Sequence, residues 1–186
     1  QMTKLLNSPN TSTLLGIRDK TILELLYSTG IRRSECAALT IHDVDYQGGY
    51  LRVNQGKGRK DRVVPLGRKA CEYLKEYILK VRPKYLQDNL DERLLFVGIL
   101  RKAITDQSLN IMVRKHAQKA GIAHPVSIHT IRRTFATHML RNEAHPMYIQ
   151  KILGHTYTRT LNRYVRVSGV DLKKTHQRTH PRETKA

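Results

Sequence analysis

The hydrophobic pattern of the chain changes its period near residue 50, and this change most constrains the fold. Upstream, apolar residues such as Ile22 and Leu26 recur at helical spacing. Between Tyr50 and Pro65 the period is two on both sides of a basic segment that contains two glycines, which predicts a β-hairpin. Helical patterns return at 68–80, 107–120, 129–141 and 146–153. The sequence therefore predicts a mostly α fold with a small antiparallel β-sheet, in the α+β class.

Glycine, proline and polar clusters suggest where these elements end. Gly30 predicts the end of the first long helix, and a second helix should run from about Arg33 to Leu39. Residues 1–13 are polar and read as a linker rather than packed structure, so the domain proper should begin near Leu14. Short helices are possible at the end of the chain, at 158–164 and 169–176.

Charge and composition limit the classes of partner. The 186 residues suit one compact domain, and 34 Lys and Arg against 15 Asp and Glu give a formal charge of +19. The basic residues crowd at 57–62, 66–69, 159–166 and 173–185, which favours a polyanion such as nucleic acid. No apolar run approaches the ~20 residues of a membrane-spanning helix. Only two cysteines occur, so we expect reduced thiols and a cytoplasmic protein.

Two pairs of residues have spacing suited to holding an anion. Arg32 and Glu35 are three residues apart in a predicted helix, where the carboxylate can hold the guanidinium in place. His129 and Arg132 have the same spacing, which puts both side chains on one helical face. Apolar residues of that helix would bury its opposite side, namely Ile131, Phe135, Ala136 and Met139. A solvated helix start with a salt bridge is the alternative explanation for the first pair, and a surface helix could carry the second pair by chance.

Three other residues fit the same chemistry less specifically. Lys57 lies between two glycines, where a mobile ammonium group can reach a DNA groove and donate a proton, although most basic turns only contact DNA. His155 follows Gly154, a residue that predicts a helix end. Tyr164 is one of nine tyrosines, and a tyrosine is by default a core aromatic residue. With a free pKa of about 10, a tyrosine needs surrounding cations to act as a nucleophile.

Taken in order, four segments of the chain resemble the tyrosine recombinase family, which includes the integrases and the Xer-type resolvases. The resemblance covers about residues 16–167. It departs from the usual pattern at Ile131, where leucine is common, and at Thr160-Leu161, where two threonines are usual. The four segments are STGIRRSE (28–35), GKGRKDR (56–62), SIHTIRRTFATH (127–138) and LGHTYTRTLNRY (153–164).

The resemblance implies a role for each candidate. Tyr164 would attack a DNA phosphodiester to form a 3′-phosphotyrosine, without a metal ion, ATP or another cofactor. Arg32, rather than Arg33, and Arg132 would clamp the phosphate, and His129 would handle protons near the nucleophile. The other implied roles are a leaving-group acid at Lys57, a phosphate donor at His155, and DNA-binding contacts at Arg59, Lys60, Arg133 and Arg159.

The resemblance also implies how the chain is organised and assembled. Residues 14–167 would form the catalytic domain, and residues 1–13 would link it to an N-terminal core-binding domain that is missing upstream. Residues 168–186 would form a C-terminal helix and polar tail that can contact a neighbouring protomer. We expect double-stranded DNA as partner, a homotetramer on paired sites, a monomer in isolation, no membrane partner, and a nucleoid-associated location in the cytoplasm.

Other function classes remain open from the residues alone. A metal-dependent nuclease needs clustered carboxylates, and the nearest approach to one is the pair Asp43 and Asp45. His176 and His180 have zinc-like spacing but lack paired cysteines nearby, which favours a polar tail. A type IB topoisomerase would use the same residue types and reseal the same strand. A DNA-binding protein that keeps this fold without catalysis is the third alternative.

Overall fold

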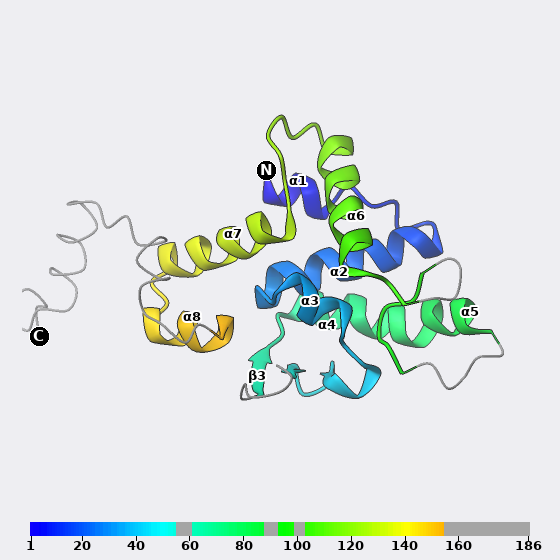
Figure 1. The fold of residues 1–186 in the computed structure, drawn as a ribbon, viewed down its shortest axis with the longest axis horizontal. Coiled ribbons are helices and arrows are strands. Elements are labelled where there is room, and N and C mark those ends of the chain that lie inside the picture. The colour runs from blue at the N-terminus through cyan, green and yellow to red at the C-terminus, as the bar shows by residue number, and fades with distance from the viewer. Residues whose placement is uncertain (55–60, 88–92, 99–102, 155–186) are drawn as a thin grey trace, which may run out of the picture.

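Helices make up most of this computed structural model, which describes residues 1–54, 61–87, 93–98 and 103–154, and one small sheet lies at its lower side (Figure 1). The predicted mostly helical fold with a small antiparallel sheet is confirmed. The α-helices are α1 (Met2–Leu6), α2 (Leu14–Thr29), α3 (Arg33–Ala37), α4 (Arg68–Glu76), α5 (Arg82–Leu86), α6 (Asp106–Lys119), α7 (Ile128–Arg141) and α8 (Pro146–Leu153). A 3-10 turn, η1 (Ile41–Asp43), and a π-helical turn, η2 (Tyr77–Val81), complete the helical part.

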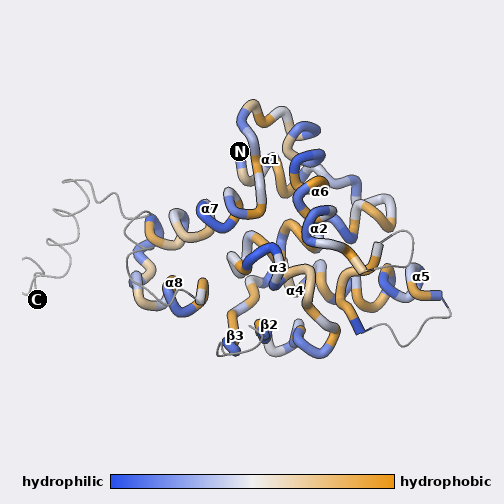
Figure 2. The backbone as a smooth tube through the Cα atoms, viewed as in Figure 1, coloured by the Kyte–Doolittle hydropathy of each residue, from blue (hydrophilic) through white to orange (hydrophobic). Residues whose placement is uncertain are grey.

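Helix α2 runs through the middle of the fold and packs against both α4 and α7 (Figures 1 and 2). Thr13 caps its first turn by accepting a hydrogen bond from the Gly16 N–H. Gly30 ends the helix with φ of 60°, the left-handed conformation that favours glycine. A Cβ at this position would approach Phe135 of α7 and Leu153 of α8 to less than 3 Å. The predicted end of α2 is therefore confirmed, and it is also where three helices meet.

The sheet has three antiparallel strands in the order β1 (Val44–Asp45), β2 (Tyr50–Val53) and β3 (Arg62–Pro65). The predicted hairpin is confirmed, with Leu51 opposite Val64 and both of these side chains buried. Strand β1 was not predicted, because two residues are too few to display a period of two. Strand β3 lies at the edge of the sheet and contacts α8.

The first residues of the chain are packed, contrary to the prediction of an unpacked linker over residues 1–13. Helix α1 places Leu5 in the main core, where it is 1% exposed. The Lys20 ammonium group donates a hydrogen bond of 2.7 Å to the Leu6 carbonyl. Polar composition suggested a linker, but buried Leu5, with Met2 and Leu6 partly buried beside it, docks this short helix on the core. That prediction is wrong for Met2–Leu6.

A buried polar network next to α1 helps to hold it. The Arg18 guanidinium donates twice to Asp19 Oδ1, and His116 Nε2 lies 3.0 Å from Asp19 Oδ2. On its other side, His116 Nδ1 lies 3.1 Å from the Ser8 hydroxyl, which donates its proton to the Leu5 carbonyl. Because that proton is already engaged, the Ser8, His116 and Asp19 arrangement is structural rather than a hydrolytic triad. We call Ser8, Arg18, Asp19 and His116 the α2–α6 network.

Helices α7 and α8 lie together on one side of the molecule, away from α5 (Figure 1). Their contact is a small apolar cluster of Phe135, Ala136, Ile149 and Leu153. Ser127 caps α7 by accepting a hydrogen bond from the Thr130 N–H, and Gly154 ends α8 with φ of 63°. Among the described residues, no helix combines the length and the apolar character that crossing a membrane requires.

Candidate active site

Arg32 lies immediately before α3 and is fixed from two sides. Its Nη1 donates to Glu35 Oε1 at 2.6 Å, and its backbone N–H donates to Glu35 Oε2 at 2.7 Å. Its Nη2 donates to the Gly154 carbonyl at 2.8 Å, which joins the start of α3 to the end of α8. The predicted contact between Arg32 and Glu35 is confirmed. The Arg32 side chain remains 32% exposed, so solvent and ligands can reach it.

Glu35 also binds a second arginine, Arg62, at the start of β3. Arg62 Nη1 and Nη2 donate to the two carboxylate oxygens at 2.9 and 2.8 Å. Burial by itself raises the pKa of Glu35, but the bonds from Arg62 and Arg32 outweigh it and lower that pKa to about 2. Glu35 is therefore ionised at neutral pH and bridges two guanidinium groups.

Arg132 approaches the same place from α7. It is only 5% exposed, because the flanking residues Ile131 and Phe135 pack into the interior. Its Nη1 donates to the Gly30 carbonyl, and its Nη2 donates to the Leu153 carbonyl at 2.7 Å. Arg132 thus links the end of α2 to the end of α8.

The end of α8 is the point on which all three arginines converge. Arg62, Arg132 and Arg32 donate to three successive carbonyls, those of Ile152, Leu153 and Gly154. The last carbonyls of a helix have no partner within it and carry a partial negative charge, so guanidinium groups are favourable partners there. We call Arg32, Arg62, Arg132 and Glu35 the arginine cluster.

The arginine cluster carries an excess of positive charge. It holds three guanidinium groups and one carboxylate, which leaves a surplus of two positive charges before the helix end is considered. Planar groups that stay charged at all ordinary pH values, held by a fixed frame, suit the oxygens of a phosphate. The geometry can therefore hold a phosphodiester and stabilise negative charge that develops on it.

The other described candidates lie on the same elements but outside the cluster. His129 is exposed, one turn before Arg132 on α7, and Arg133 is exposed beside it. Arg33 points elsewhere and pairs with Asp106 of α6 at 2.8 Å. The sequence-based preference for Arg32 over Arg33 therefore agrees with the geometry, since only Arg32 reaches the end of α8.

Six residues of the predicted site lie outside the described part of the chain, so their predicted roles stay predictions. They are Lys57, Arg59, Lys60, His155, Arg159 and Tyr164. Arg62 lies two residues after one undescribed segment and belongs to the arginine cluster, and Gly154 directly precedes another and accepts a hydrogen bond from that cluster. The described geometry thus reaches the edge of both segments.

The role of Arg62 was not predicted from the sequence, although the strand pattern contains a signal for it. With a period of two, Arg62 shares the inward face of β3 with buried Val64, and it pairs across the hairpin with buried Val53. A charged residue at an inward position needs a partner, because burying an unpaired charge is costly. That partner, Glu35, cannot be identified from the pattern.

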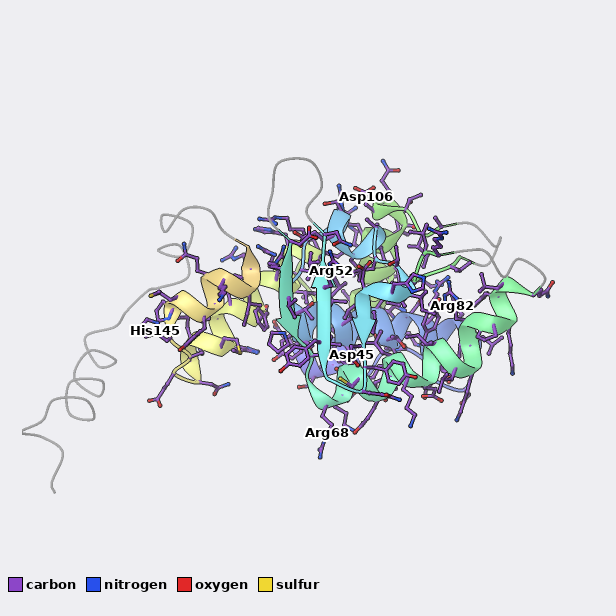
Figure 3. The ribbon with its side chains drawn as sticks, turned by 90° about the horizontal axis from the view of Figure 1, so that it is seen from below. Asp45, Arg52, Arg68, Arg82, Asp106 and His145 are labelled. Carbon is purple, nitrogen blue, oxygen red and sulfur yellow. The ribbon has the colours of Figure 1, made fainter. Side chains whose placement is uncertain are left out.

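The carboxylates considered as metal ligands have structural roles. Asp43 accepts hydrogen bonds from Thr40 and from the Asn54 amide, and Asp45 accepts two backbone N–H groups of the following turn. Figure 3 shows Asp45 on the sheet, far from His145 at the start of α8. Within residues 1–54, 61–87, 93–98 and 103–154, no three His, Cys, Asp or Glu side chains form a group that could hold a metal ion.

Comparison with protein families and curated sequences gives consistent matches. The model of the phage integrase family matches residues 1–169. The tyrosine recombinase XerD of Staphylococcus saprophyticus is 40% identical over 178 residues, which make up 96% of this chain and 60% of that protein. The tyrosine recombinase XerD of Staphylococcus aureus is 39% identical over the same length. The chain thus spans about 60% of the length of the curated relatives it matches.

Solved structures agree with this fold. The XerA recombinase superimposes with a TM-score of 0.79 at 30% identity, covering 97% of this chain and 63% of that one. The XerH recombinase, solved bound to its difH substrate in a pre-cleavage complex, has a TM-score of 0.78 at 24% identity and covers 95% of this chain and 51% of that one. At that lower identity, the likeness to XerH concerns the fold alone.

Proposed function

Because this chain belongs to the phage integrase family, we propose that it is the catalytic domain of a site-specific tyrosine recombinase that cleaves and rejoins DNA strands. The observation that carries the proposal is the arginine cluster. Hydrogen bonds hold Arg32 and Arg132 in place there, and the positive charges outnumber the one carboxylate. A scissile phosphate is the anion that would complete it.

In the proposed reaction the cluster stabilises a displacement at phosphorus. The Tyr164 oxygen attacks the phosphorus atom, its proton passes to a neighbouring base, and the bond to the 5′-oxygen breaks as Lys57 protonates that oxygen. Arg32, Arg132 and His155 would hold the non-bridging oxygens, and His129 would handle protons near Tyr164. The 5′-hydroxyl of the partner strand then attacks the 3′-phosphotyrosine, which releases Tyr164 and reseals the strand.

The same proposal covers the partners and the location. Arg59, Lys60, Arg133 and Arg159 would contact the DNA backbone, where contacts position the protein without reading sequence. Four protomers would act on two paired sites, with residues 168–186 reaching a neighbour, while the isolated chain would be a monomer. Residues 14–167 would form the catalytic domain, and the chain would reach it from a core-binding domain through residues 1–13, of which Met2–Leu6 pack on the catalytic domain as α1. Recombination of chromosomal or mobile DNA would place the protein in the cytoplasm, at the nucleoid.

Covalent capture tests the proposed nucleophile. The protein is incubated with a pool of nicked duplexes of varied sequence. After cleavage, the short fragment that carries the released 5′-hydroxyl diffuses away, and the adduct remains trapped. We expect an adduct with the unmodified protein and none with Tyr164→Phe, which lacks only the attacking hydroxyl. Tyr157→Phe is the matched control because it removes a hydroxyl seven residues away. An adduct that survives Tyr164→Phe and disappears in Tyr157→Phe would show that the nucleophile is misassigned.

A second arm of the experiment separates this chemistry from that of a nuclease. Guanidinium groups supply the positive charge at the phosphate, so the adduct should form at an undiminished rate in excess EDTA. Cleavage that EDTA abolishes and added magnesium or manganese restores, with no protein joined to the DNA, would contradict the proposal.

A further inference from the structure

Arg62 is a buried arginine whose three guanidinium nitrogens are all engaged. Nη1 and Nη2 bind the two oxygens of Glu35, and Nε donates to the Ile152 carbonyl at 2.7 Å. Its side chain is 8% exposed. An arginine enclosed in this way is not available to contact DNA directly, so its effect on a bound phosphate must pass through the groups it holds.

One of those groups is the Glu35 carboxylate. A bidentate pair fixes both the distance and the plane of a carboxylate, which a single contact does not. The same two oxygens accept Arg32 Nη1 and the Arg32 backbone N–H. Arg62 therefore sets the orientation of the carboxylate that, in turn, sets the orientation of Arg32.

The other group is the last turn of α8. The Arg62 bond to Ile152 lies next to the bonds that Arg132 and Arg32 make to Leu153 and Gly154. Because Arg62 is the first residue of β3, this bond ties the base of the hairpin to the end of α8. In the sequence, Lys57 precedes Arg62 by five residues, and His155 directly follows Gly154.

Arg32 has donors to spare within this frame. A guanidinium group has five N–H donors, and two of them are used in the side-chain bonds to Glu35 and Gly154, which leaves three with no acceptor among the residues that the structure describes. The value of these remaining donors to a phosphate depends on their direction, because a small displacement of a catalytic group can cost a large part of the rate.

We propose that Arg62 is a positioning residue for strand cleavage. It orients Arg32 through Glu35, and it fixes the start of β3 relative to the end of α8. This inference rests on the proposed function. Arg62 itself does not touch the DNA. Its removal should therefore slow the chemical step while leaving DNA affinity nearly unchanged.

The test compares single-turnover adduct formation and DNA affinity in the protein and its variants. The variants are Arg62→Ala, Arg62→Lys, Arg32→Ala and the double variant Arg32→Ala with Arg62→Ala. Arg52→Ala is the matched control, because Arg52 is on the neighbouring strand, 63% exposed, and pairs with exposed Asp61 (Figure 3). Thermal unfolding of each variant identifies those that are folded at the assay temperature.

We expect Arg62→Ala to slow adduct formation by about 10- to 100-fold, the usual range for a residue that orients a functional group. The dissociation constant for DNA should change by less than about threefold, since no phosphate contact is lost. Because Arg62 acts through Arg32, the double variant should be within about twofold of Arg32→Ala. Arg52→Ala should react at the unmodified rate.

Arg62→Lys serves if Arg62→Ala does not fold. A single ammonium group cannot reproduce a planar fork with a third donor to Ile152, so Arg62→Lys should still be slowed by about tenfold. A folded Arg62→Lys with the unmodified rate would overturn the inference, as would rate losses that multiply in the double variant. If the unmodified protein forms no adduct at all, the proposed function fails and this inference fails with it.

Discussion

The arginine cluster and the α2–α6 network are two answers to the same problem, a guanidinium group removed from water next to a carboxylate. In the α2–α6 network, Arg18 pairs with Asp19, and the side chains of Arg18, Asp19 and His116 are all about 10% exposed or less. In the arginine cluster, Glu35 is the one carboxylate beside three arginines, of which it binds Arg32 and Arg62, and Arg32 is 32% exposed. The first is balanced and closed, whereas the second is unbalanced and open.

This difference separates charge that serves the fold from charge that serves a ligand. A closed pair satisfies its own charge, so its contribution is to fix the position of the first residues and of α6 against α2. A surplus of positive charge with accessible N–H donors is stable only because a helix end offsets part of it, and it gains more when an anion arrives. Accessible guanidinium N–H donors beside a surplus of positive charge therefore distinguish a ligand site from a structural ion pair better than burial does.

The largest expected effect breaks the closed network. Asp19→Ala leaves Arg18 and His116 without their carboxylate, so the free energy of unfolding should fall by about 3–5 kcal/mol. The measurement is urea unfolding followed by circular dichroism. Asp61→Ala removes a carboxylate from an exposed pair with Arg52 and should cost about 1 kcal/mol or less. Equal losses in the two variants would mean that the α2–α6 network is not structural.

The next effect concerns chemistry rather than stability. Arg32→Ala should lower the rate of adduct formation by about 10²- to 10³-fold, as expected for the loss of one donor to a developing negative charge. Arg18→Ala, assayed at a temperature where it is folded, should stay within about threefold of the unmodified rate. A comparable loss of adduct-formation rate in Arg32→Ala and Arg18→Ala would show that the arginine cluster and the α2–α6 network do not differ in function.

The smallest effect tests whether Glu35 is the anion that the cluster requires. Folding lowers the pKa of Glu35 from 4.5 to about 2, so its ionised form stabilises the fold fully above pH 4.5. That stabilisation, about 3 kcal/mol, should be lost as the pH falls from 4.5 toward 2. The measurement is the stability difference between the unmodified protein and Glu35→Gln across this range. A difference that does not change with pH would show that the cluster does not hold Glu35 ionised.

Local patterns predicted most of the fold. Helices α2, α6, α7 and α8 follow periodic apolar residues, and Gly30 and Gly154 adopt the left-handed conformation that ends a helix. The hairpin follows its period of two. The errors occur where an element is too short for a period, as in β1, or where polar composition hides one buried side chain, as at Leu5 in α1.

The site was predictable only in part, for a similar reason. The contact between Arg32 and Glu35 depends on a spacing of three residues, so the sequence specifies it. The contact between Arg62 and Glu35 spans 27 residues, and those of Arg62 and Arg32 with the end of α8 span 90 and 122. The acceptors at α8 are backbone carbonyls, which every residue has, so no residue type marks them.

By itself, the sequence determined the helical periods and the hairpin, because each depends on residues close together in the chain, and it determined the positive charge and the order of the four family-like segments, because composition and order need no folding. Only the tertiary structure decided that Arg62 joins Glu35, that three guanidinium groups converge on one helix end, and that Arg32 stays accessible while Arg18 is enclosed. The reason is physical. Packing α2, α7, α8 and β3 together fixes which backbone carbonyls face which arginines, and that packing is a property of the whole core.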